Sequence, residues 1–129
     1  MNMRIVSTLA VLAIGAALAQ TSEPPPIKRT LLQRMDVGGN LELIVGLAEI
    51  APGGTTGRHT HFGVESGYVL QGSASMQVEG EPDRALKAGD SYAIAAGKAH
   101  EARALGAEPA KVIASYVVEK GKPLATPAP

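Results

Sequence analysis

The stretch GGTTGRHTHFGVESGYVLQG, residues 53–72, carries the most informative pattern in this chain of 129 residues. Within it, one residue separates His59 from His61, and three residues separate His61 from Glu65. The chain has only three histidines, and the third, His100, lies downstream. For a single histidine, an ordinary surface or core position would be the better interpretation. The matched spacing of all four residues instead marks them as candidate functional residues.

The same four residues form a plausible ligand set for a metal ion. Side chains alternate between the faces of a strand, so His59 and His61 point the same way if this segment is extended. Residues 62–64 can turn the chain, and Glu65 then returns on the neighbouring strand. His100 must arrive from a distant strand, which a small barrel allows. Three imidazoles and one carboxylate suit one divalent transition metal, such as iron, manganese, nickel, zinc or copper, and leave coordination positions for substrate or dioxygen.

The rest of the chain predicts an all-β fold. Short segments of strand-forming residues alternate with turn signals every 8 to 12 residues or so, which is typical of a sandwich or barrel. The expected strands cover residues 41–50, 68–70, 75–78, 84–87, 91–95, 99–105 and 111–119. Gln71-Gly72 is predicted as a hairpin turn and 88–90 as a second turn. The sequence shows no helical stripe after the leader.

The first 19 residues resemble a secretory signal peptide. Arg4 gives a positive start, residues 5–18 are apolar or small, and Ala17-Leu18-Ala19 precedes the expected cleavage site. The alternative is an uncleaved membrane anchor, but the apolar run is shorter than the ~20 residues of a spanning helix. We therefore expect an exported protein, periplasmic or secreted, with no membrane attachment after cleavage.

Composition narrows the possible partners. Loss of Arg4 with the leader leaves 11 basic and 12 acidic residues, so charge gives no reason to expect nucleic acid or an anionic membrane as a partner. The chain has one phenylalanine, three tyrosines and no tryptophan, which argues against base stacking on single-stranded nucleic acid. It has no cysteine, so disulfides, thiolate ligands and a lipid anchor on cysteine are excluded. A small-molecule ligand or substrate remains the expected partner.

Proline-rich ends frame the expected domain. We divide the chain into a signal peptide at 1–19, an N-terminal linker and leading strand at 20–39, a central domain at 40–119 and a proline-rich tail at 120–129. The linker contains Pro24-Pro25-Pro26, and residues 20–29 and the tail are both expected to be extended and poorly ordered.

These motifs resemble those of the cupin superfamily, over about residues 40–119. The first cupin motif is matched at Gly53, His59, His61, Glu65 and Gly72. The second is matched at Gly89, Gly97 and His100, but Ala95 stands where proline is usual and Ala104 where asparagine is usual. Residues 110–124 resemble the last strand of small, single-domain, quercetin-dioxygenase-like cupins. The two alanines remove no ligand, although they change the loop before His100 and one hydrogen-bonding position after it.

The resemblance implies a double-stranded β-helix, or jelly-roll barrel, with a metal bound by His59, His61, Glu65 and His100. It also implies a homodimer and a catalytic role for Glu65 as a proton acceptor. Three functions remain open: a small-molecule dioxygenase, a metal-dependent isomerase or lyase, and a non-catalytic module that binds a small ligand or metal. Further residues that could line the cavity, although packing or solvent-facing positions are the better interpretation, are Gln71, Gln77, Tyr92, Glu101, Arg103 and Tyr116.

Overall fold

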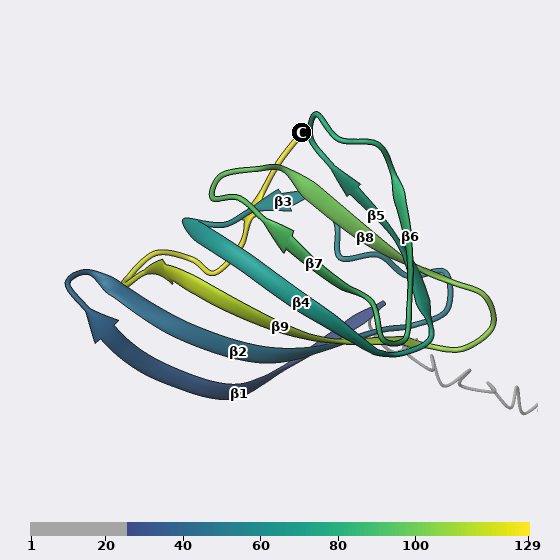
Figure 1. The fold of residues 1–129 in the computed structure, drawn as a ribbon, viewed down its shortest axis with the longest axis horizontal. Coiled ribbons are helices and arrows are strands. Elements are labelled where there is room, and N and C mark those ends of the chain that lie inside the picture. Colours follow the sequence, from purple (N-terminus) through teal and green to yellow (C-terminus); the bar gives the residue numbers. More distant parts are fainter. Residues whose placement is uncertain (1–25) are drawn as a thin grey trace, which may run out of the picture.

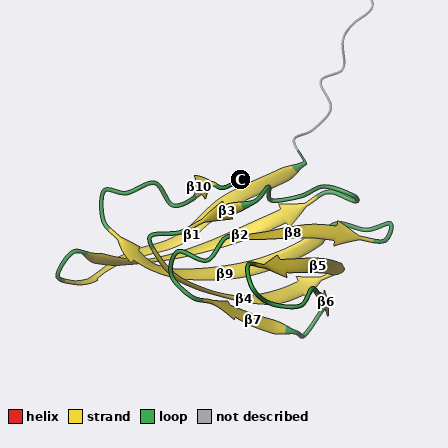
Figure 2. Cartoon of the chain, turned by 90° about the horizontal axis from the view of Figure 1, so that it is seen from above, coloured by secondary structure: helices red, strands yellow, loops and turns green. Residues whose placement is uncertain are grey.

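The computed structural model describes residues 26–129 as two five-stranded antiparallel sheets (Figure 1). The first sheet has the order β1 (Ile27–Gly38), β2 (Leu41–Ile50), β9 (Ala110–Glu119), β4 (Gly63–Gln71) and β7 (Ser91–Ile94). The second sheet has the order β10 (Thr126–Pro127), β3 (His59–Thr60), β8 (His100–Leu105), β5 (Ser73–Val78) and β6 (Arg84–Lys87). Figure 2 shows strands joined by loops, with no helix in this part of the chain. The all-β prediction is therefore confirmed.

Strand alternation directs one face of each sheet into the interior. In β8, His100, Ala102 and Ala104 are buried, and the residues between them are more exposed. In β4 every second residue from Glu65 to Val69 is buried in the same way. Apolar residues of both sheets then form one core, which includes Ile50, Val69, Met76, Leu86, Ile94 and Val112. The same alternation that fills the core therefore points His100 and Glu65 inward.

All seven predicted strands are present, although β4 begins at Gly63 rather than at residue 68. The predicted hairpin at Gln71-Gly72 is wrong, because β4 and β5 lie in different sheets. Gly72 instead marks the crossing between the sheets, with a φ of 73°. A Cβ there would lie 2.5 Å from the carbonyl oxygen of Pro109, so no other residue fits without movement. A hairpin and a sheet crossing both use such a glycine, and local sequence does not distinguish them.

Both ends of the described chain are more ordered than the sequence predicted. Residues 27–29, expected in the linker, belong to β1, which pairs with β2 along its length. In the proline-rich tail, Thr126 and Pro127 pair with Thr60 and His59 of β3. The predicted signal peptide and residues 20–25 lie outside the described residues, and the proposed domain boundaries stay predictions. Within residues 26–129, no helix is long and apolar enough to cross a membrane.

Candidate metal centre

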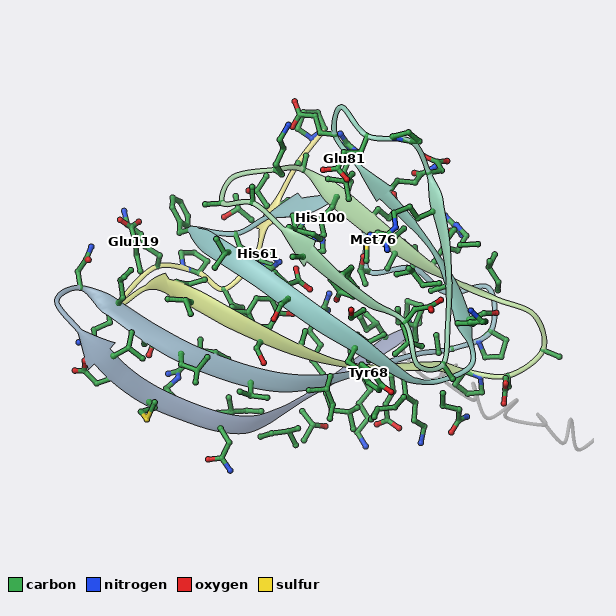
Figure 3. All side chains as sticks on the ribbon, in the orientation of Figure 1. His61, Tyr68, Met76, Glu81, His100 and Glu119 are labelled. Atoms are coloured by element: carbon green, nitrogen blue, oxygen red, sulfur yellow. The ribbon has the colours of Figure 1, made fainter. Side chains whose placement is uncertain are left out.

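The four predicted ligand residues come together between the two sheets. The three histidines belong to the second sheet or its flank: His59 on β3 lies opposite His100 on β8, and His61 follows β3 directly. Glu65 comes from β4, in the first sheet. The prediction that Glu65 returns on a strand neighbouring His59 is therefore wrong, because β3 and β4 do not pair. Figure 3 labels His61 and His100 in the region between β4 and β8.

The distances within this cluster suit a shared ion. One ligand atom from each residue lies within 4.8 Å of the other three. The Nε2 atoms of His61 and His100 each lie 2.9 Å from Oε2 of Glu65. Two ligand atoms that bind one ion at right angles, each about 2.1 Å from it, lie about 3 Å apart. The four side chains could therefore hold a metal ion without a change of fold.

Backbone carbonyl groups fix the orientation of all three imidazole rings. Nδ1 of His59 lies 2.7 Å from the Gly57 carbonyl oxygen, and Nδ1 of His100 lies 2.9 Å from that of Lys98. Nδ1 of His61 likewise contacts the carbonyl oxygen of Leu124, in the tail. Since a carbonyl only accepts, each Nδ1 carries the proton and donates it. In the neutral rings Nε2 is then left with a free lone pair, as a metal ligand requires.

The cluster has the polarity of a cation site. His61 Nε2 is buried and makes no hydrogen bond of acceptable geometry within residues 26–129, although Glu65 Oε2 lies 2.9 Å away. Two lone pairs that face each other at this distance repel unless a positive charge lies between them. A divalent cation shared by the three rings and the carboxylate would supply that charge. The donor set of three nitrogens and one carboxylate oxygen suits a transition metal.

The electrostatic environment keeps Glu65 ionised. Burial alone would raise the pKa of this carboxyl, but the close approach of the His100 and His61 rings outweighs burial and lowers the pKa to about 2. Burial also lowers the pKa of His59, which favours its neutral form. At His100 burial acts in the same direction, but contacts with Glu65 and the Lys98 carbonyl raise the pKa above its ordinary value. Protons therefore compete with a metal more strongly at His100 than at His59.

Tyr92 on β7 holds the other oxygen of Glu65. Its hydroxyl donates to Oε1 across 2.8 Å, and both side chains are buried. Burial and the neighbouring carboxylate raise the pKa of Tyr92, so the hydroxyl stays a donor. The ring has room because Gly67 lies opposite it in the sheet, where a Cβ would come within 2.3 Å of the ring. Tyr92 and Gly67 thus together orient Glu65 toward the histidines.

A cavity of about 400 Å³ opens beside this cluster. Tyr116 on β9 lines it, with its ring 4.9 Å from that of His61. Burial raises the pKa of Tyr116, which keeps its hydroxyl protonated. The deeper wall is apolar and includes Val69, Ala74, Met76, Leu86, Ala102 and Val112. Cavities of this size hold small organic molecules.

The weaker candidates from the sequence divide into two groups. Tyr92 and Tyr116 line the cavity, although packing had been the favoured interpretation for both. The other four, Gln71, Gln77, Glu101 and Arg103, are not part of its lining. Arg29 and Arg58 also line the cavity, and no sequence motif had pointed to either of them. Only the pairing of β1 with β2 and the course of the loop before His59 place these arginines there.

Comparison with known proteins identifies the class. The cupin domain family model matches residues 46–118, so this chain belongs to the cupin family and has the cupin fold. Among curated protein sequences, none matches this chain significantly. The predicted family is therefore confirmed, with the His59, His61, Glu65 and His100 cluster in its interior.

Solved structures agree with this assignment. The chain resembles a cupin superfamily protein from Desulfitobacterium hafniense DCB-2, with 19% identity, a TM-score of 0.61, and coverage of 72% of this chain and 78% of that one. It also resembles the DMSP lyase DddQ from Ruegeria pomeroyi DSS-3, with 20% identity, a TM-score of 0.67, and coverage of 80% and 52%. It also resembles a recombinant oxalate oxidase in complex with glycolate, with 23% identity, a TM-score of 0.65, and coverage of 86% of this chain and 59% of that one. At these identities the likeness establishes the fold alone.

Proposed function

We propose that this protein is a metal-dependent cupin enzyme that acts on a small molecule, with dioxygenase chemistry as its reaction. The observation that carries the proposal is a set of three imidazole rings, each fixed through Nδ1 by a backbone carbonyl, that cluster with Glu65 beside a cavity of about 400 Å³. A divalent transition metal bound there supplies Lewis-acid or redox chemistry at positions left open to substrate and dioxygen.

The residues around the site have separate tasks in this proposal. Glu65 would help to hold the metal and would serve as the proton acceptor for a substrate hydroxyl or C–H group. Tyr92 keeps Glu65 in place through the hydrogen bond to Oε1. Tyr116 presents a protonated hydroxyl to the cavity and can donate to a substrate oxygen. The apolar wall excludes water and orients the rest of the substrate.

Two other functions use the same site. A metal-dependent isomerase or lyase would need the ion only as a Lewis acid, and a non-catalytic module would bind a ligand without turnover. The proteins similar in fold include both a lyase and an oxidase, which supports an enzyme in general and leaves the reaction to experiment. The modest cavity favours small substrates over large aromatic ones.

The experiment has two stages. Metal analysis of the purified protein, followed by titration with iron(II), manganese(II), nickel(II), zinc(II) and copper(II), establishes whether one equivalent binds. Dioxygen uptake is then measured with a panel of small diketones and hydroxy acids. Uptake that requires both metal and substrate is expected. Turnover under strict anaerobiosis would favour the lyase or isomerase, and binding without turnover would favour the ligand-binding module.

Export and dimerisation belong to the same proposal. We infer that residues 1–19 direct export, so the mature protein should begin at Gln20, which mass spectrometry of the exported protein would test. The homodimer is supported by β1, an edge strand of the first sheet that exposes Leu31, Leu32, Met35 and Val37. Dimerisation would cover this apolar edge. Sedimentation that shows only monomer at working concentration would reject it.

A further inference from the structure

We propose that Arg29 and Arg58 form a clamp for the carboxylate group of a small anionic substrate, at the mouth of the cavity beside the metal centre. This inference rests on the proposed function, because it names the substrate class of the same site. It begins with the position of each arginine in the fold. Both arginines line the cavity, and neither is buried: Arg29 is exposed and Arg58 is half-buried. We therefore place them at the mouth of the cavity.

Arg29 occupies an inward position that would ordinarily be apolar. It is the first of four residues that lie side by side across four neighbouring strands of the first sheet. The other three are Ala48 on β2, Val112 on β9 and Val69 on β4. Val69 is fully buried, and Val112 is 6% exposed. The small side chain of Ala48 leaves the end of this apolar row open to the cavity. At that point Arg29 lines the cavity from the edge strand, with its side chain still exposed.

The two arginines converge on one loop. Nη2 of Arg29 donates to the carbonyl oxygen of Thr56 across 3.4 Å, which brings its guanidinium group beside the loop that carries Arg58 two residues later. The backbone carbonyl of Arg58 accepts from the N–H of Ala128, so the tail fixes the loop from the other side. The first sheet and the loop before β3 thus each contribute one arginine to the lining of the cavity.

No carboxylate within residues 26–129 neutralises either arginine through an ion pair. By contrast Arg34, also on β1, pairs with Glu42 at 3.5 Å. In the part of the chain that the structure describes, Glu65 is the only acidic residue that lines the cavity, and both its oxygens are already engaged. With a divalent cation bound, the lining carries a net positive charge. Such a site attracts an anion, and arginine binds a carboxylate through two parallel N–H groups.

The geometry therefore indicates a short monocarboxylate. Its carboxylate would lie at the arginines, an adjacent oxygen would face the metal centre, and a short aliphatic part would contact the apolar wall. An alternative role for Arg29 is to protect the open edge of β1, since inward-pointing charges on edge strands hinder aggregation. That role predicts a change in association and none in ligand binding, so one binding experiment separates the two.

The test measures lactate binding to the full-length mature protein loaded with cobalt(II), whose visible absorption reports metal occupancy. Lactamide, the neutral amide of the same shape, is the matched ligand control. Titration calorimetry is expected to show lactate binding at least tenfold more tightly than lactamide. Arg29→Gln and Arg58→Gln should each weaken lactate binding by about tenfold to a hundredfold, the loss expected for a hydrogen bond to a charged group. Cobalt occupancy should be unchanged in both variants.

Two further variants sharpen the result. Lys28→Gln removes a positive charge from the neighbouring position on β1, on the opposite face, and should leave lactate binding unchanged. Arg29→Lys keeps the charge but loses the planar pair of donors, so it should restore binding only in part. Equal binding of lactate and lactamide, undetectable lactate binding at millimolar concentration, or unchanged binding in both arginine variants would overturn the clamp.

Failure of the clamp and failure of the metal site give different results. If the protein takes up no cobalt(II), the proposed function fails at the first step. Arginine-dependent preference for lactate in the metal-free protein would then still support the clamp. If cobalt(II) binds with one equivalent but the arginine variants bind lactate like the wild type, the clamp fails and the metal site stands.

Discussion

The hydrogen bond from Tyr92 to Glu65 gives the sharpest test of how the metal centre is held. Tyr92→Phe removes one hydroxyl and keeps the ring that packs over Gly67, so the change isolates the bond of 2.8 Å to Oε1. Both side chains are buried, at 9% and 6% exposure, so water does not readily replace the lost donor. A hydrogen bond to a charged group contributes about 1.5–3 kcal/mol, and we expect the free energy of unfolding to fall by about 2 kcal/mol.

Metal affinity should fall in the same variant, because the lost partner orients a ligand. Substitution of such supporting residues typically lowers metal affinity by about tenfold to a hundredfold. The assay is urea unfolding in the presence of a chelator, together with zinc titration against a competing chelator. Tyr68→Phe is the matched control, since Tyr68 lies on the outer face of β4 and is 49% exposed. It should change stability by less than about 0.5 kcal/mol. Equal unfolding midpoints and zinc affinities for the two variants would refute the reasoning.

Three other perturbations test the same centre. His100→Ala should lower metal occupancy and abolish most of the rise in melting temperature on zinc addition, because metal binding stabilises only the folded state. A rise as large as that of the wild type would contradict the assignment of His100 as a ligand. Deletion of residues 123–129 removes the Leu124 carbonyl that orients His61, so it should weaken zinc binding about tenfold. Deletion of Pro129 alone should leave zinc binding unchanged. Competition with a chelator measures the zinc affinity of both variants. Zinc affinity should fall as the pH decreases, because protons compete for the imidazoles. The raised pKa of His100 means that protonated His100 opposes binding below that pKa, so the fall should begin above pH 6.5 and be complete in acid. A zinc affinity that does not change between pH 8 and pH 5.5 would contradict this prediction.

The sequence predicted the strands well and their arrangement poorly. Turn residues and alternation identified seven strands because both signals are local. Membership of a sheet depends on pairing between distant segments, so Gln71-Gly72 was misread as a hairpin. The tail was misread for a related reason. Prolines favour linkers, but Pro127 lies on a two-residue edge strand, where the missing N–H costs little.

The sequence likewise predicted one part of the candidate site and missed another. The spacing of His59, His61 and Glu65 was sufficient to group these residues, because a metal needs specific donor atoms and strand alternation aligns them. Tyr92 could not be identified in this way. Its role depends on lying opposite Gly67 across two strands that are distant in sequence, and on the absence of a Cβ there. No motif of local spacing encodes such a pair.

The two departures from the second cupin motif can be understood from the hydrogen bonds around His100. Where proline is usual, Ala95 accepts from the N–H of Lys98 at 3.2 Å, and Gly97 donates to the carbonyl of His61 at 3.1 Å. The loop is therefore held by backbone bonds to itself and to a neighbouring ligand segment, and the Lys98 carbonyl then orients His100. Where asparagine is usual, Ala104 is buried in the core, and its N–H donates to Gly54. With alanine at both positions, the side chains of His59, His61, Glu65 and His100 still lie together as a cluster that could hold a metal ion.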